Sequence, residues 1–125
     1  MFRILLVEDN LTYRAMLKKV LLQRFPQLEI GEAGDEEQAL LQADSLDPDL
    51  ILMDIHLPRC NGLDLTRTIK STHAQPVVII LSSHDLPEYR NAIQLFGTDY
   101  FVSKNGSLEE VFELVEEVIS NKTLH

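Results

Sequence analysis

The chain has 125 residues, of which 45% are hydrophobic and 25% are charged, so we expect one ordinary globular domain. This composition excludes disordered, collagen-like and disulfide-framework proteins. The one cysteine, Cys60, excludes an intrachain disulfide and a multi-cysteine metal site. The net charge of −9 disfavours direct binding of nucleic acid, because phosphates attract the opposite sign.

The sequence predicts no membrane segment. Apolar runs such as Leu50–Met53 and Val77–Leu81 are far shorter than the roughly 18–20 residues that a membrane helix needs. The N-terminus leads directly into a strand-like run and lacks the pattern of a signal peptide. We therefore expect a cytoplasmic protein.

Strand-like runs alternate with helical stretches along the first half of the chain. The first run, Phe2–Val7, is almost wholly apolar, as expected of a parallel strand covered on both faces. Asn10 is a candidate N-cap for the helix that follows. The run Leu28–Ala33 is the most polar and is expected at an edge of the sheet, and Asp35 then caps a second helix.

The middle of the chain continues the same alternation. Leu50–Asp54 predicts the third strand, which ends in an acid, and a helix is expected to begin near Gly62. The run Val77–Leu81 is the richest in β-branched residues and predicts the central strand. Pro87 and Gly97 suit the first turn and the end of the next helix.

The last strand and helix complete the pattern. Asp99–Ser103 predicts a short fifth strand, and the capping-box sequence from Ser107 to Glu110 predicts the start of the final helix. Parallel neighbours need crossover connections, so this alternation predicts an α/β fold with a doubly wound five-stranded parallel sheet. We expect one domain over residues 1–120, with residues 121–125 as a C-terminal tail or the start of a linker.

Polar residues follow four of the predicted strands, at the edge where open α/β sheets place their functional crevice. They are Glu8, Asp9, Asp54, Ser82 and Lys104. Each alone has a plain structural explanation, such as a helix cap, a turn acid or a solvated loop charge. Together, however, converging carboxylates repel one another and raise their pKa values unless a cation lies among them.

Mg²⁺ is the cation that suits this arrangement, because it takes one or two protein carboxylates and keeps positions for water and phosphate. The crevice then becomes a phosphoryl site. Asp54 can act as the nucleophile that forms an aspartyl-phosphate, while Lys104 neutralises the developing charge and Ser82 binds a phosphoryl oxygen.

These residues carry a family resemblance over essentially the whole chain. The run Ile4–Asn10, the block Asp49–Pro58 followed by Gly62, and the positions of Ser82 and Lys104 resemble the CheY-like receiver domains of response regulators in two-component signalling. The resemblance implies a flavodoxin-like (βα)5 fold with strand order 2-1-3-4-5.

The resemblance also implies a site and its partners. Asp54 would accept a phosphoryl group from a histidine kinase or a phosphotransfer protein. Glu8, Asp9, Asp54 and the backbone carbonyl of His56 would organise Mg²⁺, with Asp9 as a direct ligand and Glu8 acting through water. No enzymatic activity is expected beyond the chain's own phosphorylation and dephosphorylation.

Ser82 and Phe101 are implied to form the switch that reports phosphorylation. An aspartyl-phosphate would draw the Ser82 hydroxyl inward and open a space for Phe101. The signal would reach the face made by the fourth helix, fifth strand and fifth helix, through which a homodimer is also expected. Phe101 as a plain core aromatic is the alternative.

The sequence departs from the family after Lys104, where proline, commonly in a cis bond, is usual and Asn105-Gly106 stands instead. A cis bond before a residue other than proline costs about 2.5–4 kcal/mol, so the sequence does not fix the geometry of this loop, although the reach of the Lys104 amine need not change. The run Lys104–Ser107 resembles receivers that precede a helix-turn-helix domain of the LuxR or NarL kind, which implies transcription regulation. His56 and His84 are expected to tune the lifetime of the phosphate.

Two other classes of protein are alternatives. A degenerate receiver would serve only as a protein-interaction module, marked by an intact fold without Mg²⁺ binding. A flavin binder is disfavoured because Glu8-Asp9-Asn10 repels an anion, and a haloacid-dehalogenase-like hydrolase would place an acid where His56 stands.

Overall fold

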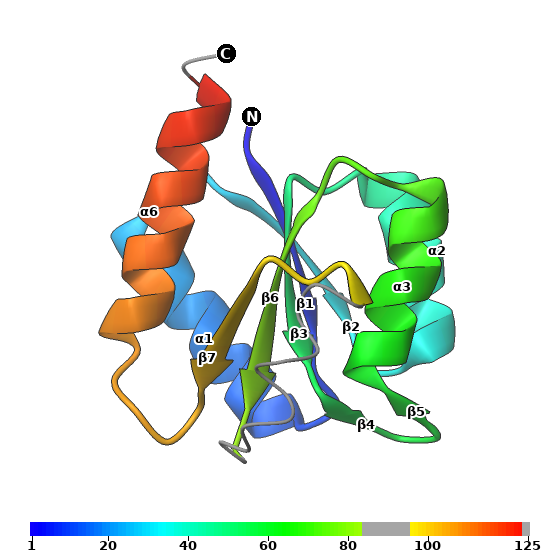
Figure 1. The fold of residues 1–125 in the computed structure, drawn as a ribbon. Helices are drawn as coiled ribbons and strands as arrows, with labels where there is room; N and C mark the ends of the chain where they lie inside the picture. The colour runs from blue at the N-terminus through cyan, green and yellow to red at the C-terminus, as the bar shows by residue number, and fades with distance from the viewer. Residues whose placement is uncertain (84–95, 124–125) are drawn as a thin grey trace.

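The structure, a computed structural model, describes residues 1–83 and 96–123. Its centre is a parallel sheet of five strands in the order β2-β1-β3-β6-β7, which is the predicted order 2-1-3-4-5 (Figure 1). The strands are β1 (Arg3–Val7), β2 (Glu29–Ala33), β3 (Leu50–Asp54), β6 (Val77–Ser82) and β7 (Tyr100–Ser103). The helices within the described ranges are α1 (Leu11–Arg24), α2 (Glu36–Leu46), α3 (Gly62–Thr72) and α6 (Glu109–Thr123).

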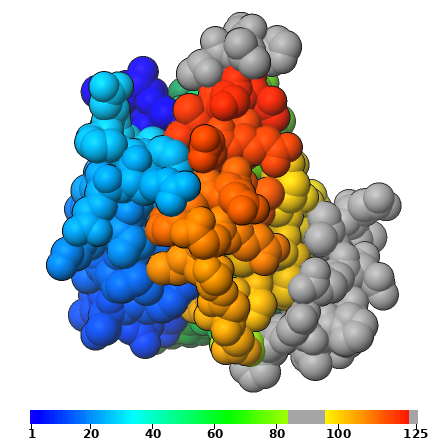
Figure 2. Space-filling view, turned by 90° about the vertical axis from the view of Figure 1, so that its left-hand side faces the viewer, coloured from blue at the N-terminus to red at the C-terminus, as the bar shows by residue number. Residues whose placement is uncertain are grey.

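Helices cover both faces of the sheet, so the core has two layers. Successive residues of a strand point to opposite faces. Leu5 therefore packs in one apolar cluster, beneath α2 and α3, and Leu6 packs in the other, beneath α1 and α6. Figure 2 shows α1, in blue, and α6, in orange to red, lying against one another over the second face.

The edge prediction is confirmed and the central-strand prediction is wrong. The polar run Leu28–Ala33 contains β2, which lies at one edge of the sheet. The run Val77–Leu81 belongs to β6, whereas β3 (Leu50–Asp54) occupies the middle. Richness in β-branched residues indicates burial on both faces, and β3 and β6 share that burial, so composition does not rank their positions.

A short hairpin between β3 and α3 is an element that periodicity does not predict. Strands β4 (His56–Leu57) and β5 (Cys60–Asn61) pair in antiparallel fashion. Arg59 takes a left-handed conformation, with φ of 67°, in the turn between them. Asn61 then caps α3 by accepting a hydrogen bond from the Leu63 N–H at 2.7 Å, and α3 begins at Gly62 as predicted.

The C-terminal part of the chain agrees with the sequence where it is described. Gly97 has φ of 80°, the left-handed value expected at the end of a helix, while Pro87 and the predicted helix before Gly97 lie outside the described residues. The Ser107 hydroxyl accepts a hydrogen bond from the Glu109 N–H at 3.0 Å and caps α6. Helix α6 extends to Thr123, and the domain limit at residue 120 stays a prediction.

Among the described residues, no helix has both the length and the apolar character that a bilayer crossing requires.

Candidate functional site

The candidate site lies at the edge of the sheet where four parallel strands end. The strands are aligned there: Val7 of β1 pairs with Met53 of β3, and Ser82 of β6 pairs with Ser103 of β7. Residues that directly follow these positions are therefore brought to one edge.

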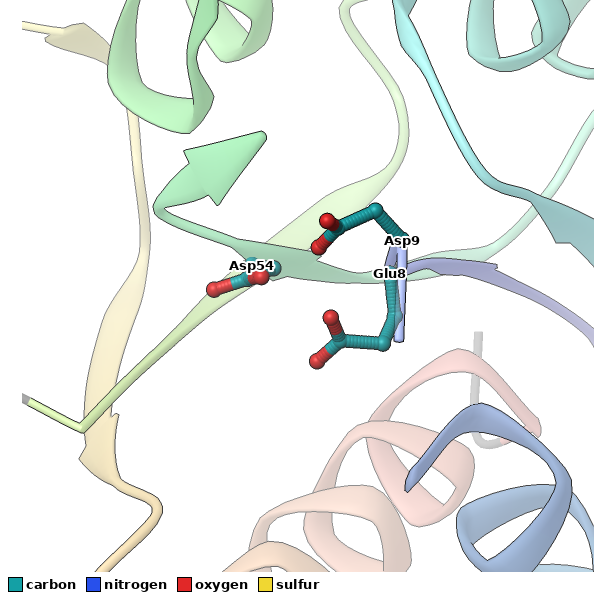
Figure 3. A group of neighbouring side chains, drawn as sticks. All are labelled: Glu8, Asp9 and Asp54. Carbon is teal, nitrogen blue, oxygen red and sulfur yellow. The ribbon is translucent and has the colours of Figure 1, made fainter. Parts of the chain in front are cut away.

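Three carboxylates meet at this edge. One oxygen atom each from Glu8, Asp9 and Asp54 lies within 4.8 Å of the others, and Figure 3 shows the three side chains gathered where β1 and β3 end. Glu8 and Asp54 are buried, with 3% and 5% of their surface exposed, whereas Asp9 is exposed to solvent. The Glu8 N–H donates to the Ala33 carbonyl at 2.9 Å, which ties this acid to the end of β2.

Lys104 brings an ammonium group to the same cluster. Its Nζ donates a hydrogen bond to Glu8 Oε1 and lies 3.3 Å from Asp54 Oδ1. Burial acts to lower the pKa of Lys104, but the hydrogen bond to Glu8 and the charge of Asp54 outweigh it and raise this pKa above its usual value. The lysine therefore remains charged between the two buried acids.

The pKa of Glu8 shows that burial and a second acid together outweigh the effect of this lysine. Burial raises the pKa of Glu8, the Lys104 hydrogen bond opposes that rise, and the neighbouring Asp54 adds to it. The cluster holds three carboxylates and one ammonium, so a further positive charge would relieve the repulsion among the carboxylates. Carboxylate oxygens are the ligands that Mg²⁺ prefers, and the residues present therefore suit that ion.

The loop after β3 holds Asp54 in place. The His56 N–H donates to Asp54 Oδ1 at 3.2 Å, and the His56 side chain is exposed. The Gly62 N–H donates to the Ile55 carbonyl at 2.8 Å, which joins the start of α3 to the end of β3. A Cβ atom at Gly62 would overlap the Asp54 carbonyl oxygen, so this position needs glycine for a close approach of two backbones.

Ser82 and Phe101 lie on neighbouring strands. Ser82 is fully buried at the end of β6, and its carbonyl accepts the Lys104 N–H at 2.7 Å, so it reaches the same edge as the acids. Phe101 lies further back along β7, 5% exposed, and packs in the apolar cluster beneath α2 and α3. The structure thus places Phe101 in the core, and His84 lies outside the described residues.

Two hydrogen bonds of Asn105 hold the loop after Lys104, and the sequence did not predict them. The described residues contain no cis peptide bond, so Lys104 and Asn105 are joined by a trans bond. The Asn105 side-chain amide donates to the Ser83 carbonyl at 2.7 Å, and the Asn105 N–H donates to Ser103 Oγ at 3.1 Å. Asn105 therefore ties this loop to the end of β6, in the place where the family usually has proline.

Comparison with known proteins identifies the family. The family model described as "Response regulator receiver domain" matches residues 4–116. The chain belongs to this family. Two readings of the fold, a flavin binder and a haloacid-dehalogenase-like hydrolase, are thereby set aside.

Curated relatives of this receiver domain are longer than the chain. The transcriptional regulatory protein YdfI of Bacillus subtilis is 32% identical over 99% of the chain, and the chain spans 58% of YdfI. A protein-glutamate methylesterase/protein-glutamine glutaminase of Vibrio vulnificus is 35% identical over 79% of the chain, which spans 29% of that relative. Receiver domains of this kind therefore occur beside different further segments.

Solved structures share the receiver fold. The response regulator TrrA of Thermotoga maritima, solved in complex with Mg²⁺ and BeF, has a TM-score of 0.83 and 30% identity, with 94% of this chain and 99% of that one covered. A LuxR-family response regulator of Aurantimonas has a TM-score of 0.86 and 25% identity, with 95% and 85% covered. Mg²⁺ is thus found in a relative of the same fold.

Proposed function

We propose that this receiver domain is a phosphoacceptor switch in which Asp54 receives the phosphoryl group. The supporting observation is the position of Asp54, which is buried at the end of β3, shares a carboxylate cluster with Glu8 and Asp9, and lies 3.3 Å from the Lys104 ammonium. A nucleophilic carboxylate beside a fixed positive charge is the arrangement that phosphoryl transfer needs.

The donor in this proposal is a phosphohistidine of a histidine kinase or a phosphotransfer protein. An Asp54 carboxylate oxygen forms a bond to phosphorus, and the P–N bond breaks with its electron pair passing to the imidazole, which takes up a proton. Lys104 is already charged, so it can neutralise the phosphoryl oxygens without a proton transfer.

Mg²⁺ would be held by Glu8, Asp9, Asp54 and the backbone carbonyl of His56, with Asp9 as a direct ligand and Glu8 acting through water. When bound, the ion supplies positive charge that offsets the carboxylates and the phosphoryl oxygens. The Mg²⁺ complex of TrrA and the carboxylate spacing in this chain support this part of the proposal.

The response to phosphorylation is assigned to Ser82 and Phe101. The Ser82 hydroxyl would move toward a phosphoryl oxygen on Asp54, and Phe101 would change its packing beside it. The burial of both side chains supports this step, because a packed core has few arrangements and converts a small pull into a discrete change. The predicted homodimer face includes β7 and α6, and its fourth helix lies outside the described residues.

The proposed function includes an output that the receiver domain would control. YdfI is named a transcriptional regulatory protein and the Aurantimonas relative is named a LuxR-family regulator, so we infer a DNA-binding output in transcription regulation. The net charge of −9 disfavours nucleic-acid binding by the receiver domain itself.

A small phosphodonor tests the proposal. The wild-type chain and Asp54→Ala are incubated with acetyl phosphate and Mg²⁺, or with a chelator, and their intact masses are compared. The wild type should gain one phosphoryl group only with Mg²⁺, and Asp54→Ala should gain none. An equal gain in both chains would contradict the site assignment, and a folded wild type that neither gains mass nor binds Mg²⁺ would indicate a degenerate interaction module instead.

A further inference from the structure

The Lys104 ammonium has an aromatic neighbour. Its Nζ lies 4.6 Å from the centroid of the Tyr13 ring, within the roughly 6 Å over which the face of a ring attracts a cation. Tyr13 is half-buried in the first turn of α1. The ring therefore contacts the same nitrogen atom that pairs with Glu8 and Asp54.

The start of α1 fixes Tyr13 relative to the acids. Its N–H donates to Asn10 Oδ1 at 3.0 Å, and Asn10 is the N-cap residue that directly follows Glu8 and Asp9. Burial raises the pKa of the Tyr13 phenol, so the ring stays neutral at physiological pH. The segment from Glu8 to Tyr13 thus places one carboxylate and a neutral ring beside the Lys104 ammonium.

The lysine needs such a neighbour because its own geometry is loose. A lysine side chain is a flexible four-carbon stem with a freely rotating ammonium, and the two carboxylates attract it without fixing the stem. A carboxylate in the place of the ring would add an oxygen that competes with the phosphoryl group for the ammonium. A ring attracts the cation through its face and offers no such oxygen.

We propose that Tyr13 is a positioning residue whose ring holds the Lys104 ammonium beside Asp54, ready for the oxygens of an incoming phosphoryl group. This inference rests on the proposed function of Asp54 and Lys104. The attraction comes from the face of the ring, so the hydroxyl is dispensable. Phenylalanine at position 13 should preserve the position of the ammonium, and an aliphatic side chain should not.

Four variants separate this role from a general effect on the fold. Tyr13→Phe keeps the ring, and Tyr13→Leu removes it with a good helix former. Tyr13→Met gives a second ring-free side chain in case the leucine variant does not fold. Phe112→Leu is the matched control, because the Phe112 ring faces the Arg24 guanidinium at 5.3 Å near the other end of α1.

The first readout needs neither metal nor phosphate. In the proton spectrum of the chain labelled at lysine, the ε-methylene of Lys104 should be shifted upfield by the Tyr13 ring current. The shift should persist in Tyr13→Phe and Phe112→Leu and disappear in the two ring-free variants.

The second readout is the rate constant for phosphorylation by acetyl phosphate with Mg²⁺. Ring-free variants should react roughly 3- to 30-fold more slowly, while Tyr13→Phe and Phe112→Leu should react at the wild-type rate. A wild-type rate in a ring-free variant, or an equal slowing in Tyr13→Phe, would overturn the inference while leaving the proposed function intact. A wild type that is not phosphorylated at all would instead refute the proposed function, and this inference with it.

Discussion

Gly62 packs against the main chain of Asp54 so closely that any side chain at position 62 would overlap the Asp54 carbonyl oxygen. A Cβ atom there would also stand 2.9 Å from the Ile55 Cα. Both neighbours are backbone atoms, which cannot turn aside as a flexible side chain can. The first turn of α3 therefore helps to fix the candidate phosphoacceptor.

Gly62→Ala should accordingly destabilise the domain and disturb Asp54. We expect a loss of about 1–3 kcal/mol in the free energy of unfolding, as is typical of overpacking, measured by urea denaturation. Gly106→Ala is the control, because a Cβ there would lie 3.9 Å from the Ser103 carbonyl oxygen, which is an ordinary van der Waals contact. Equal stability of the two variants would contradict the close packing at Gly62.

Asn105 should hold the Lys104 loop. Asn105→Ala removes the hydrogen bond from the side-chain amide to the Ser83 carbonyl, and one such bond contributes about 0.5–1.5 kcal/mol. Hydrogen exchange at the Lys104 N–H should therefore accelerate, by up to roughly tenfold. Asn121→Ala, at an exposed asparagine of α6, should leave this exchange rate unchanged. An unaltered Lys104 rate in Asn105→Ala would show that the amide does not fasten the loop.

Glu32 should stabilise the fold in a pH-dependent manner. It forms ion pairs with Arg14 at 3.1 Å and Lys18 at 3.0 Å. Burial acts to raise the pKa of Glu32, but these two residues outweigh it and lower the pKa below the ordinary value of 4.5. A lowered pKa in the folded state means that the stabilisation is present above the unfolded value and is lost as the pH falls through the folded value.

Glu32→Gln should therefore lower the free energy of unfolding by about 0.5–1 kcal/mol near neutral pH, as partly exposed ion pairs do. The difference from wild type should shrink as the pH falls below 4.5 and should also shrink in high salt. Thermal unfolding over a pH series measures it. A difference that grows on acidification would contradict the assigned sign.

Cys60 should be a slow nucleophile. Burial raises the pKa of its thiol, and the negative charges of Glu36, Asp64 and Asp35 add to that rise, so little thiolate is present near neutral pH. Alkylation of Cys60 by iodoacetamide should be slower than alkylation of a cysteine in an unfolded peptide, and added salt should speed the reaction by screening the acids.

Glu36→Gln tests the cause of the slow alkylation. Removing one acid should raise the rate roughly twofold, because a larger fraction of the thiol is then ionised near neutral pH. Glu113→Gln, at an exposed acid of α6, provides the control and should leave the rate unchanged. A Glu36→Gln rate equal to that of wild type would exclude the electrostatic cause.

The architecture could be predicted because its signals are local. Apolar runs and caps such as Asn10 and Asp35 mark strands and helix starts, and both residues do accept the expected hydrogen bonds. The hairpin β4–β5 escaped prediction because strands of two residues are too short to show an alternation.

The candidate site could be predicted only in part. Glu8, Asp9, Asp54 and Lys104 follow strand ends, so the rule for parallel sheets brings them together. Tyr13 and Asn105 carry no such signal. Tyr13 contacts Lys104, which lies far away in the sequence, and Asn105 stands where the family usually has proline and donates a hydrogen bond to the Ser83 carbonyl. Their contacts depend on tertiary packing, which no local pattern contains.

The chemical position of the phosphoryl group tests the central claim most directly. After reaction with acetyl phosphate and Mg²⁺, borohydride reduces an aspartyl-phosphate to homoserine, and peptide mapping by mass spectrometry locates the altered residue. Asp54 should be converted to homoserine in the Mg²⁺ sample, with no conversion when the ion is chelated. A reduced side chain at Glu8 or Asp9 with Asp54 intact, or a phosphoryl group retained on a serine, would contradict the account.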